Sequence, residues 1–149
     1  MNKEYLNVIL ADDDEGNIIL FKNIFKDLKI AVKVQSFQNG KDLMEYLNNA
    51  EAFIPEMIMM NYTISQKSSL ECLEEIKIDL RLSNMITAIY SDSLPEEDIE
   101  RILVKGANIY IKKPDNYKDL KRVVSDVITL NWQYQTSGLN KDNFILKIG

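Results

Sequence analysis

The chain has 149 residues, of which 46% are hydrophobic and 28% are charged, and this composition is typical of one soluble globular domain. Its formal net charge of −5 argues against nucleic acid as a partner, because domains that bind nucleic acid usually have a basic face. With one cysteine and no histidine, the chain excludes an intramolecular disulfide, a Cys-rich zinc site and a His-based catalytic triad.

The sequence has no feature of a secreted or membrane protein. Its N-terminus lacks the apolar core of a signal peptide, and no apolar run approaches the roughly 18 residues of a membrane span. There are also no internal repeats, low-complexity tracts or linkers. We therefore expect a cytoplasmic protein with no membrane contact.

The first part of the chain predicts two pairs of strand and helix. Residues 6–11 form an apolar run typical of a buried strand, and a run of acids follows them directly. At 18–28 the apolar residues recur at helical spacing, which predicts the first helix. Residues 32–37 alternate between apolar and polar, which predicts a strand nearer the sheet edge, and helical spacing then continues to about residue 48.

Residues 57–61 predict the central strand of the sheet. The first four of them are all apolar, as in a strand that is buried on both faces of a parallel sheet. Asn61 is the polar last residue of this strand. We expect it at the carboxyl edge of the sheet, where open α/β folds bind their ligands.

The rest of the chain continues the alternation of helix and strand. The predicted elements are a helix at about 69–78, a strand at 85–90, a helix between Pro95 and Gly106, a strand at 109–112 and a helix at about 117–130. Pro95 suits the first turn of its helix, and Gly106 suits the residue that ends it.

Five strands that alternate with five helices predict a flavodoxin-like (βα)5 fold. Its parallel sheet has the order 2-1-3-4-5 and is covered by helices on both faces. We assign residues 1–130 to this domain and 131–149 to a C-terminal extension. The extension contains Trp132 and Tyr134, so it either folds onto its own domain or forms a dimer or partner contact. It is too short for a helix-turn-helix.

Four consecutive acids follow the first strand: Asp12, Asp13, Asp14 and Glu15. One interpretation is that they stabilise the N-terminus of the next helix through its dipole, by roughly 0.3–1 kcal/mol each. The other is that two of their carboxylates, with the polar end of the central strand, form an oxygen-rich Mg²⁺ site.

Two further polar residues are predicted at the same edge of the sheet. Lys113 follows the last strand ahead of Pro114, and it either reaches the acids as a point charge or is simply solvated. Ser91 closes the fourth strand. Its hydroxyl either donates to a phosphoryl oxygen or belongs to a plain loop serine.

Four segments together resemble the receiver domain of two-component response regulators, the CheY-like family. They are VILADDD at 8–14, PEMIMMN at 55–61, IYS at 89–91 and GANIYIKKP at 106–114. The resemblance covers roughly residues 6–130. It implies a non-enzymatic signalling domain in which an aspartate at the end of the third strand accepts a phosphoryl group from a sensor histidine kinase.

The resemblance also implies a metal site and a switch. The metal site consists of Asp12, Asp13, the side chain at position 61 and the backbone carbonyl of Thr63, with Asp13 favoured as the direct Mg²⁺ ligand.

In the switch, Ser91 is the hydroxyl that senses the phosphoryl group and Lys113 is the counter-charge. Tyr110 is the aromatic side chain that turns inward on activation.

The phosphoacceptor position holds Asn61 in this chain. A carboxamide is a poor nucleophile and cannot form an acyl phosphate. We therefore expect no phosphorylation at the usual site, and Mg²⁺ binding that is weak or absent. We also expect Lys113 to turn to Asp12 or Asp13. The domain should pass on its signal through contacts with a sensor kinase, another signalling protein or a second copy of the chain.

Several alternatives stay open. Asn61 could be an engineered change in a phosphorylatable regulator, but the loop after it also departs from the family, with Ile64-Ser65 and Ser68-Ser69, and this favours natural divergence. Asp12 and Asp14 are spaced like the nucleophile and acid of haloacid dehalogenase-like phosphatases. A flavin-binding protein of the same fold would need a phosphate-binding loop that this sequence lacks.

Overall fold

The computed structural model describes residues 5–137 and 146–148. These residues form six strands and five helices. The strands are β1 (Leu6–Ala11), β2 (Val32–Phe37), β3 (Met57–Asn61), β4 (Ile86–Ser91), β5 (Ile109–Lys112) and β6 (Leu146–Ile148). The helices are α1 (Glu15–Lys26), α2 (Gly40–Asn48), α3 (Ser69–Ile78), α4 (Glu96–Val104) and α5 (Tyr117–Ser137).

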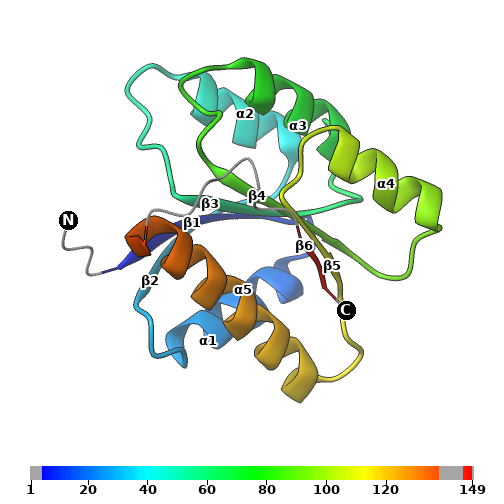
Figure 1. Ribbon diagram of the computed structural model, residues 1–149. Helices are drawn as coiled ribbons and strands as arrows, with labels where there is room; N and C mark the ends of the chain where they lie inside the picture. The colour runs from blue at the N-terminus through cyan, green and yellow to red at the C-terminus, as the bar shows by residue number, and fades with distance from the viewer. Residues whose placement is uncertain (1–4, 138–145, 149) are drawn as a thin grey trace.

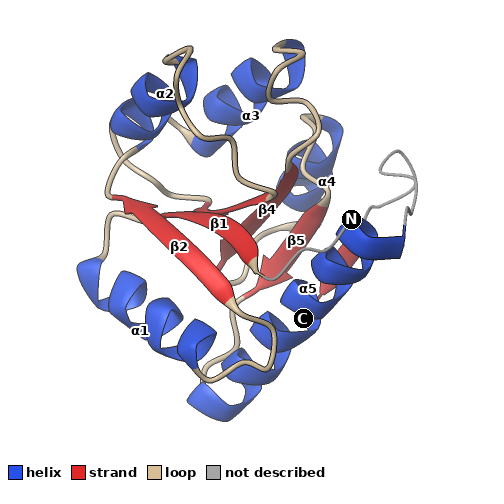
Figure 2. Ribbon diagram, turned by 90° about the vertical axis from the view of Figure 1, so that its left-hand side faces the viewer, coloured by secondary structure: helices blue, strands red, loops and turns tan. Residues whose placement is uncertain are grey.

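All six strands are parallel and lie in the order β2-β1-β3-β4-β5-β6. The predicted order 2-1-3-4-5 and the five helices are confirmed. Helices α1 and α5 cover one face of the sheet, and α2, α3 and α4 cover the other (Figures 1 and 2). The sixth strand, beside β5, is an addition that the sequence analysis did not predict, because three residues are too few to show a periodicity.

The core consists of two apolar clusters, one on each face of the sheet, and β3 contributes to both. Met57 and Met59 pack in the cluster under α1 and α5, whereas Ile58 and Met60 pack in the cluster under the other helices. None of these four side chains is exposed. The prediction of a central strand buried on both faces is confirmed, and the strand ends at Asn61.

Strand register places the ends of four strands at one level. Ala11 of β1 is opposite Met60 of β3, so Asp12 lies beside Asn61. Asn61 is in turn opposite Tyr90 of β4, and Ser91 is opposite Lys112 of β5. The polar residues that follow or end these strands therefore meet at the carboxyl edge of the sheet.

Two helices differ from their predicted bounds. Helix α1 begins at Glu15, because the side chain of Asp14 caps it, rather than near Ile18. Helix α5 continues to Ser137 instead of ending near Leu130. No glycine or proline interrupts the chain before Gly138, and Trp132 packs partly buried against the core cluster under α1 and α5. Residues 138–145 and 149 of the predicted extension lie outside the described part of the chain.

Candidate functional site

Asp12 is a fully buried carboxylate with protein donors on both oxygens. Its Oδ1 accepts the backbone N–H of Asp14 at 2.9 Å. Its Oδ2 accepts the side-chain amide of Asn17 at 3.2 Å and the phenol of Tyr90 at 2.6 Å. A buried charge is tolerated only when it is hydrogen-bonded or paired, and Asp12 obtains this compensation from the chain itself.

Tyr90 is the functional neighbour that the sequence analysis missed. It lies on β4 with 1% of its surface exposed, and its ring packs against Phe21 of α1 at a centroid distance of 4.9 Å. Burial, and then the charge of Asp12, raise the pKa of the Tyr90 phenol well above its usual range. The phenol therefore stays protonated at neutral pH and remains a donor to Asp12.

The other acids of the run have different roles. Asp14 is the N-cap of α1, and its Oδ1 accepts the backbone N–H groups of Gly16 at 2.8 Å and Asn17 at 3.3 Å. Asp13 is exposed to solvent. Within residues 5–137 and 146–148, no group of three or more Asp, Glu, Cys or His side chains is placed to hold a metal ion. Burial of Asp12 and capping by Asp14 also disfavour their use as a phosphatase nucleophile and acid.

Asn61 faces the loop that follows its strand. Its Oδ1 accepts the backbone N–H of Thr63 at 3.0 Å and the Thr63 hydroxyl at 3.1 Å. The side chain is partly buried. Two donors from one residue thus fix the carboxamide oxygen, which is the only side-chain atom of Asn61 that could ligate a hard cation.

Lys113 does not pair with an acid, and the prediction that it turns to Asp12 or Asp13 is wrong. Its Nζ donates to Oδ1 of Asn17 at 2.9 Å. No carboxylate of the described residues lies within ion-pair distance of it. The physical reason is that Asn17 bridges the two charges, since its amide group donates to Asp12 while its carbonyl accepts from Lys113.

Ser91 and Tyr110, which the resemblance assigns to the switch, are in direct contact. The Ser91 hydroxyl oxygen and the Tyr110 phenol oxygen are 2.7 Å apart, and the Ser91 hydroxyl donates to the backbone carbonyl of Asp92 at 2.6 Å. Only 2% of Tyr110 is exposed, and its ring packs in the cluster under α2, α3 and α4. The aromatic side chain is therefore turned inward in this structure.

Four of the predicted site residues line one pocket of about 220 Å³ at the carboxyl edge: Asn61, Thr63, Ser91 and Lys113. Asn17 and Tyr90 line it as well. The acids Asp12 and Asp13 are not part of its wall. Asp92, Ser93 and Leu94 complete the lining. The pocket thus presents amides, hydroxyls, one ammonium group and a single acid, Asp92, where the resemblance predicts a cluster of carboxylates.

The sheet is parallel and has acids after β1, a hydroxyl at the end of β4 and a lysine after β5. This is the arrangement of a signalling receiver domain. The sequence model of the response regulator receiver domain family matches residues 8–125. The chain belongs to this family and is the receiver domain of a two-component response regulator. No described helix is both long and apolar enough to cross a membrane.

Several known proteins are similar to this chain. The probable methanogenesis regulatory protein FilR2 of Methanothrix harundinacea is 24% identical over 123 residues, which cover 80% of this chain and 79% of that protein. The structure of the phosphorylated cyanobacterial phytochrome response regulator RcpA has a TM-score of 0.78 at 24% identity, covering 91% of this chain and 97% of that one.

The Mn²⁺-bound form of the response regulator Rcp1 has a TM-score of 0.76 at 22% identity, covering 83% of this chain and 92% of that one. At these identities the two structures show a common fold.

Proposed function

We propose that this receiver domain is not phosphorylated at the end of β3 and signals through protein contacts alone. The observation that carries the proposal is Asn61, whose neutral side chain stands where the family's phosphoacceptor aspartate is expected. An acyl phosphate forms when a carboxylate oxygen attacks phosphorus. A carboxamide has no such nucleophilic oxygen, so transfer from a phosphohistidine has no acceptor here.

The hydrogen bonds around the site support weak Mg²⁺ binding. Both oxygens of Asp12 already accept protein donors, and the oxygen of Asn61 accepts two from Thr63. The remaining ligands are the exposed carboxylate of Asp13 and the backbone carbonyl of Thr63. Mg²⁺ is usually held by one or two carboxylates together with waters and phosphate oxygens in near-octahedral geometry, and Asp13 supplies a single exposed carboxylate, so these residues support only weak binding.

The switch residues support a receiver that rests in one state. Tyr110 is inward, and its phenol is bonded to the Ser91 hydroxyl. A ligand shifts a two-state equilibrium only if it binds the two states differently, and phosphate has no covalent attachment point here. We propose that a partner protein supplies that difference at the surface of α4, β5 and α5.

The partner is a sensor histidine kinase or another signalling protein, which places the chain in the cytoplasm. A second copy of the chain, contacted through residues 131–149, is the alternative that native mass spectrometry would reveal. We also infer that Asn61 is natural, because the loop after it differs from the family pattern as well.

The test compares the unmodified chain with Asn61→Asp and with Asn23→Asp, which adds the same charge at an exposed position of α1. Each protein is incubated with Mg²⁺ and acetyl phosphate, and intact mass and Trp132 fluorescence are followed. We expect no phosphoryl adduct on the unmodified chain or on Asn23→Asp.

The response of Asn61→Asp then distinguishes a change at position 61 alone from divergence of the whole site. An adduct on this variant means that Ser91 and Lys113 are intact and that position 61 alone silences the receiver, as an engineered or a recent change would. No adduct on any variant means that the whole site has diverged. A phosphoryl adduct on the unmodified chain would refute the proposal.

A further inference from the structure

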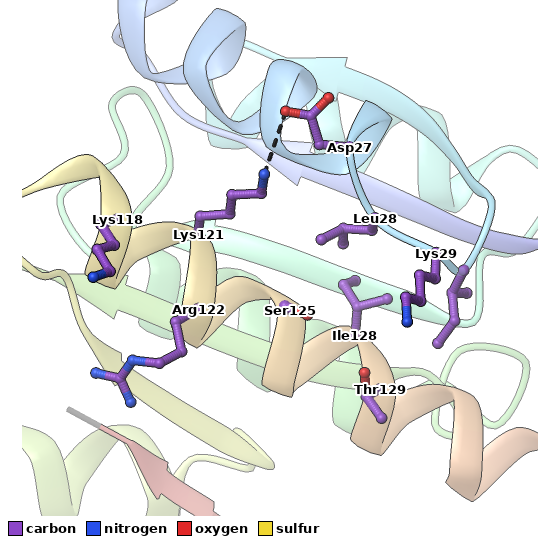
Figure 3. A pocket seen from close by; sticks show the side chains of 10 residues that line it. Asp27, Leu28, Lys29, Lys118, Lys121, Arg122, Ser125, Ile128 and Thr129 are labelled. Atoms are coloured by element: carbon purple, nitrogen blue, oxygen red, sulfur yellow. Dashed lines mark ion pairs between the residues drawn. The ribbon is translucent and has the colours of Figure 1, made fainter.

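A second and larger pocket lies between the end of α1 and the first four turns of α5. Its volume is about 570 Å³, within the roughly 300–1,000 Å³ typical of small-molecule sites. Figure 3 shows side chains from the α1–β2 connection on one side and from α5 on the other. None of its lining residues lines the pocket that contains Asn61.

The middle of this pocket is apolar. Ile128 of α5 is 1% exposed and belongs to the core cluster, and Leu28 and Ile30 of the connection pack partly buried against the same cluster. Figure 3 places Leu28 and Ile128 opposite each other across the opening. An apolar ligand body would therefore remove the partly exposed hydrocarbon of Leu28 and Ile30 from water, which favours binding, while Ile128 forms the buried floor of the pocket.

The rim of the pocket is cationic, although the whole chain has a net charge of −5. Four of its ten lining residues are Lys or Arg: Lys29, Lys118, Lys121 and Arg122. The last three lie on one face of α5, because residues three and four positions apart are neighbours on a helix. Lys29 stands at the other end of the pocket, near Ile128 (Figure 3).

The acids nearby neutralise only part of this charge. Lys121 forms an ion pair with Asp27 across the pocket at 3.5 Å, and Arg122 pairs with Asp119 on its own helix at 3.8 Å. Neither Lys29 nor Lys118 has an ion-pair partner within the described ranges. The carboxylate of Asp27 would thus compete with a bound anion for the ammonium group of Lys121.

We infer that this pocket binds a small amphiphilic anion, that is, a carboxylate or phosphate group attached to an apolar body. The anionic head lies between Lys118, Lys121 and Arg122, and the body covers Leu28 and Ile128. Cations at the rim and hydrocarbon in the middle are complementary to both parts of such a molecule. This site is independent of Asn61 and of the proposed function.

The test uses three soluble probes that separate the two parts of the ligand. The ¹⁵N-labelled full chain is titrated with decanoate below its micelle concentration, with acetate as the head alone and with decanol as the tail alone. We expect saturable shifts of the amides of Leu28, Ile30, Ser125 and Thr129 with decanoate. Acetate and decanol should bind at least about ten-fold more weakly, because each lacks one of the two contributions.

Charge variants then locate the head group. Lys118→Gln and Arg122→Gln should each weaken decanoate binding about two- to five-fold, which is the range of exposed charge pairs. Asp27→Asn should tighten it by a similar factor, since it frees Lys121 from its internal partner. Lys41→Gln removes one charge from exposed α2 on the opposite face of the sheet and should change nothing.

Three results would overturn the inference. The first is a set of amide shifts with decanoate that spread over the whole surface and persist in both Lys118→Gln and Arg122→Gln. The second is equal binding of decanol, which would leave the cations without a role. The third is binding to phosphatidylglycerol vesicles with no binding of free decanoate, which would make this face a membrane contact and not a small-molecule pocket.

Discussion

The phenol of Tyr90 and the carboxylate of Asp12 form a 2.6 Å hydrogen bond that joins β4 to the end of β1 beneath the carboxyl-edge pocket. Both residues are buried, so water does not compete for this bond. A bond to a charged acceptor is about twice as strong as one between neutral groups. Tyr90 therefore holds Asp12 as a structural carboxylate and withdraws one of its oxygens from metal binding.

Replacing Tyr90 by Phe should reveal the strength of this bond. Tyr90→Phe keeps the ring against Phe21 but leaves Asp12 with one donor fewer, and we expect a loss of about 1.5–3 kcal/mol in the free energy of unfolding. Urea denaturation followed by circular dichroism measures it. Tyr62→Phe is the matched control, because no hydrogen bond of the Tyr62 hydroxyl is present among the described residues. Equal stability of the two variants would contradict this role of Tyr90.

The raised pKa of Tyr90 predicts a loss of stability at alkaline pH. The unfolded phenol ionises near its usual value of about 10, whereas the folded phenol keeps its proton, so the unfolded state binds fewer protons above that pH. The free energy of unfolding should therefore fall as the pH rises above about 10. Tyr90→Phe should flatten this dependence, and an unchanged slope would contradict the assignment.

Ionisation of Cys72 also lowers the free energy of unfolding at alkaline pH, so its effect must be removed from the comparison. Burial raises the pKa of its thiol to about 12, so the unfolded thiol ionises first as the pH rises. The Tyr90 comparison is best made in a Cys72→Ala background, in which the remaining difference between Tyr and Phe belongs to position 90.

Asn61→Asp should make the metal-free protein less stable. Two unit charges about 4 Å apart interact by about 4 kcal/mol at an effective dielectric near 20, and Lys113 offsets part of this repulsion, which leaves a loss of about 1–3 kcal/mol. Millimolar Mg²⁺ should restore the stability of this variant, as thermal melts with and without the ion would measure.

The control for this variant is Asn23→Asp, whose new carboxylate is exposed on α1 and remote from the other acids at the sheet edge. Its melting temperature should not respond to Mg²⁺. An Asn61→Asp protein that is as stable as the unmodified chain and equally indifferent to Mg²⁺ would show that position 61 does not control the metal site.

Ser91→Ala should weaken the inward position of Tyr110. The variant removes a neutral hydrogen bond, which is worth about 0.5–1.5 kcal/mol, and leaves the buried phenol with the backbone carbonyl of Asp92, at 3.4 Å, as its acceptor. The ring signals of ¹³C-labelled tyrosine should then show exchange between inward and outward positions. Tyr110→Phe is the companion variant, because it removes the same bond together with the buried phenol that made it. A sharp, unshifted Tyr110 signal in Ser91→Ala would mean that packing alone holds the ring.

Much of the fold follows from local patterns of the sequence. The apolar run before Asn61, the alternation at 32–37 and the helical spacings between strands predict the elements and, with the rule of right-handed crossovers, the order of the first five strands. The short strand β6 and the extra turns of α5 lack such a pattern. Their existence depends on a free sheet edge at β5 and on contacts of Trp132 with the core.

The sequence by itself determined that Asn61, Ser91 and Lys113 come to one edge of the sheet, because parallel strands end on the same side. Only the tertiary structure decided their partners. Tyr90 and Asp12 are 78 residues apart, and Lys113 and Asn17 are 96 apart, so no local pattern relates them. The cationic pocket likewise depends on the tertiary structure, since its two walls come from the α1–β2 connection and from α5, which are far apart in the sequence. Which side chain bonds to which depends on distances of a few ångströms, and packing of the whole domain sets these distances.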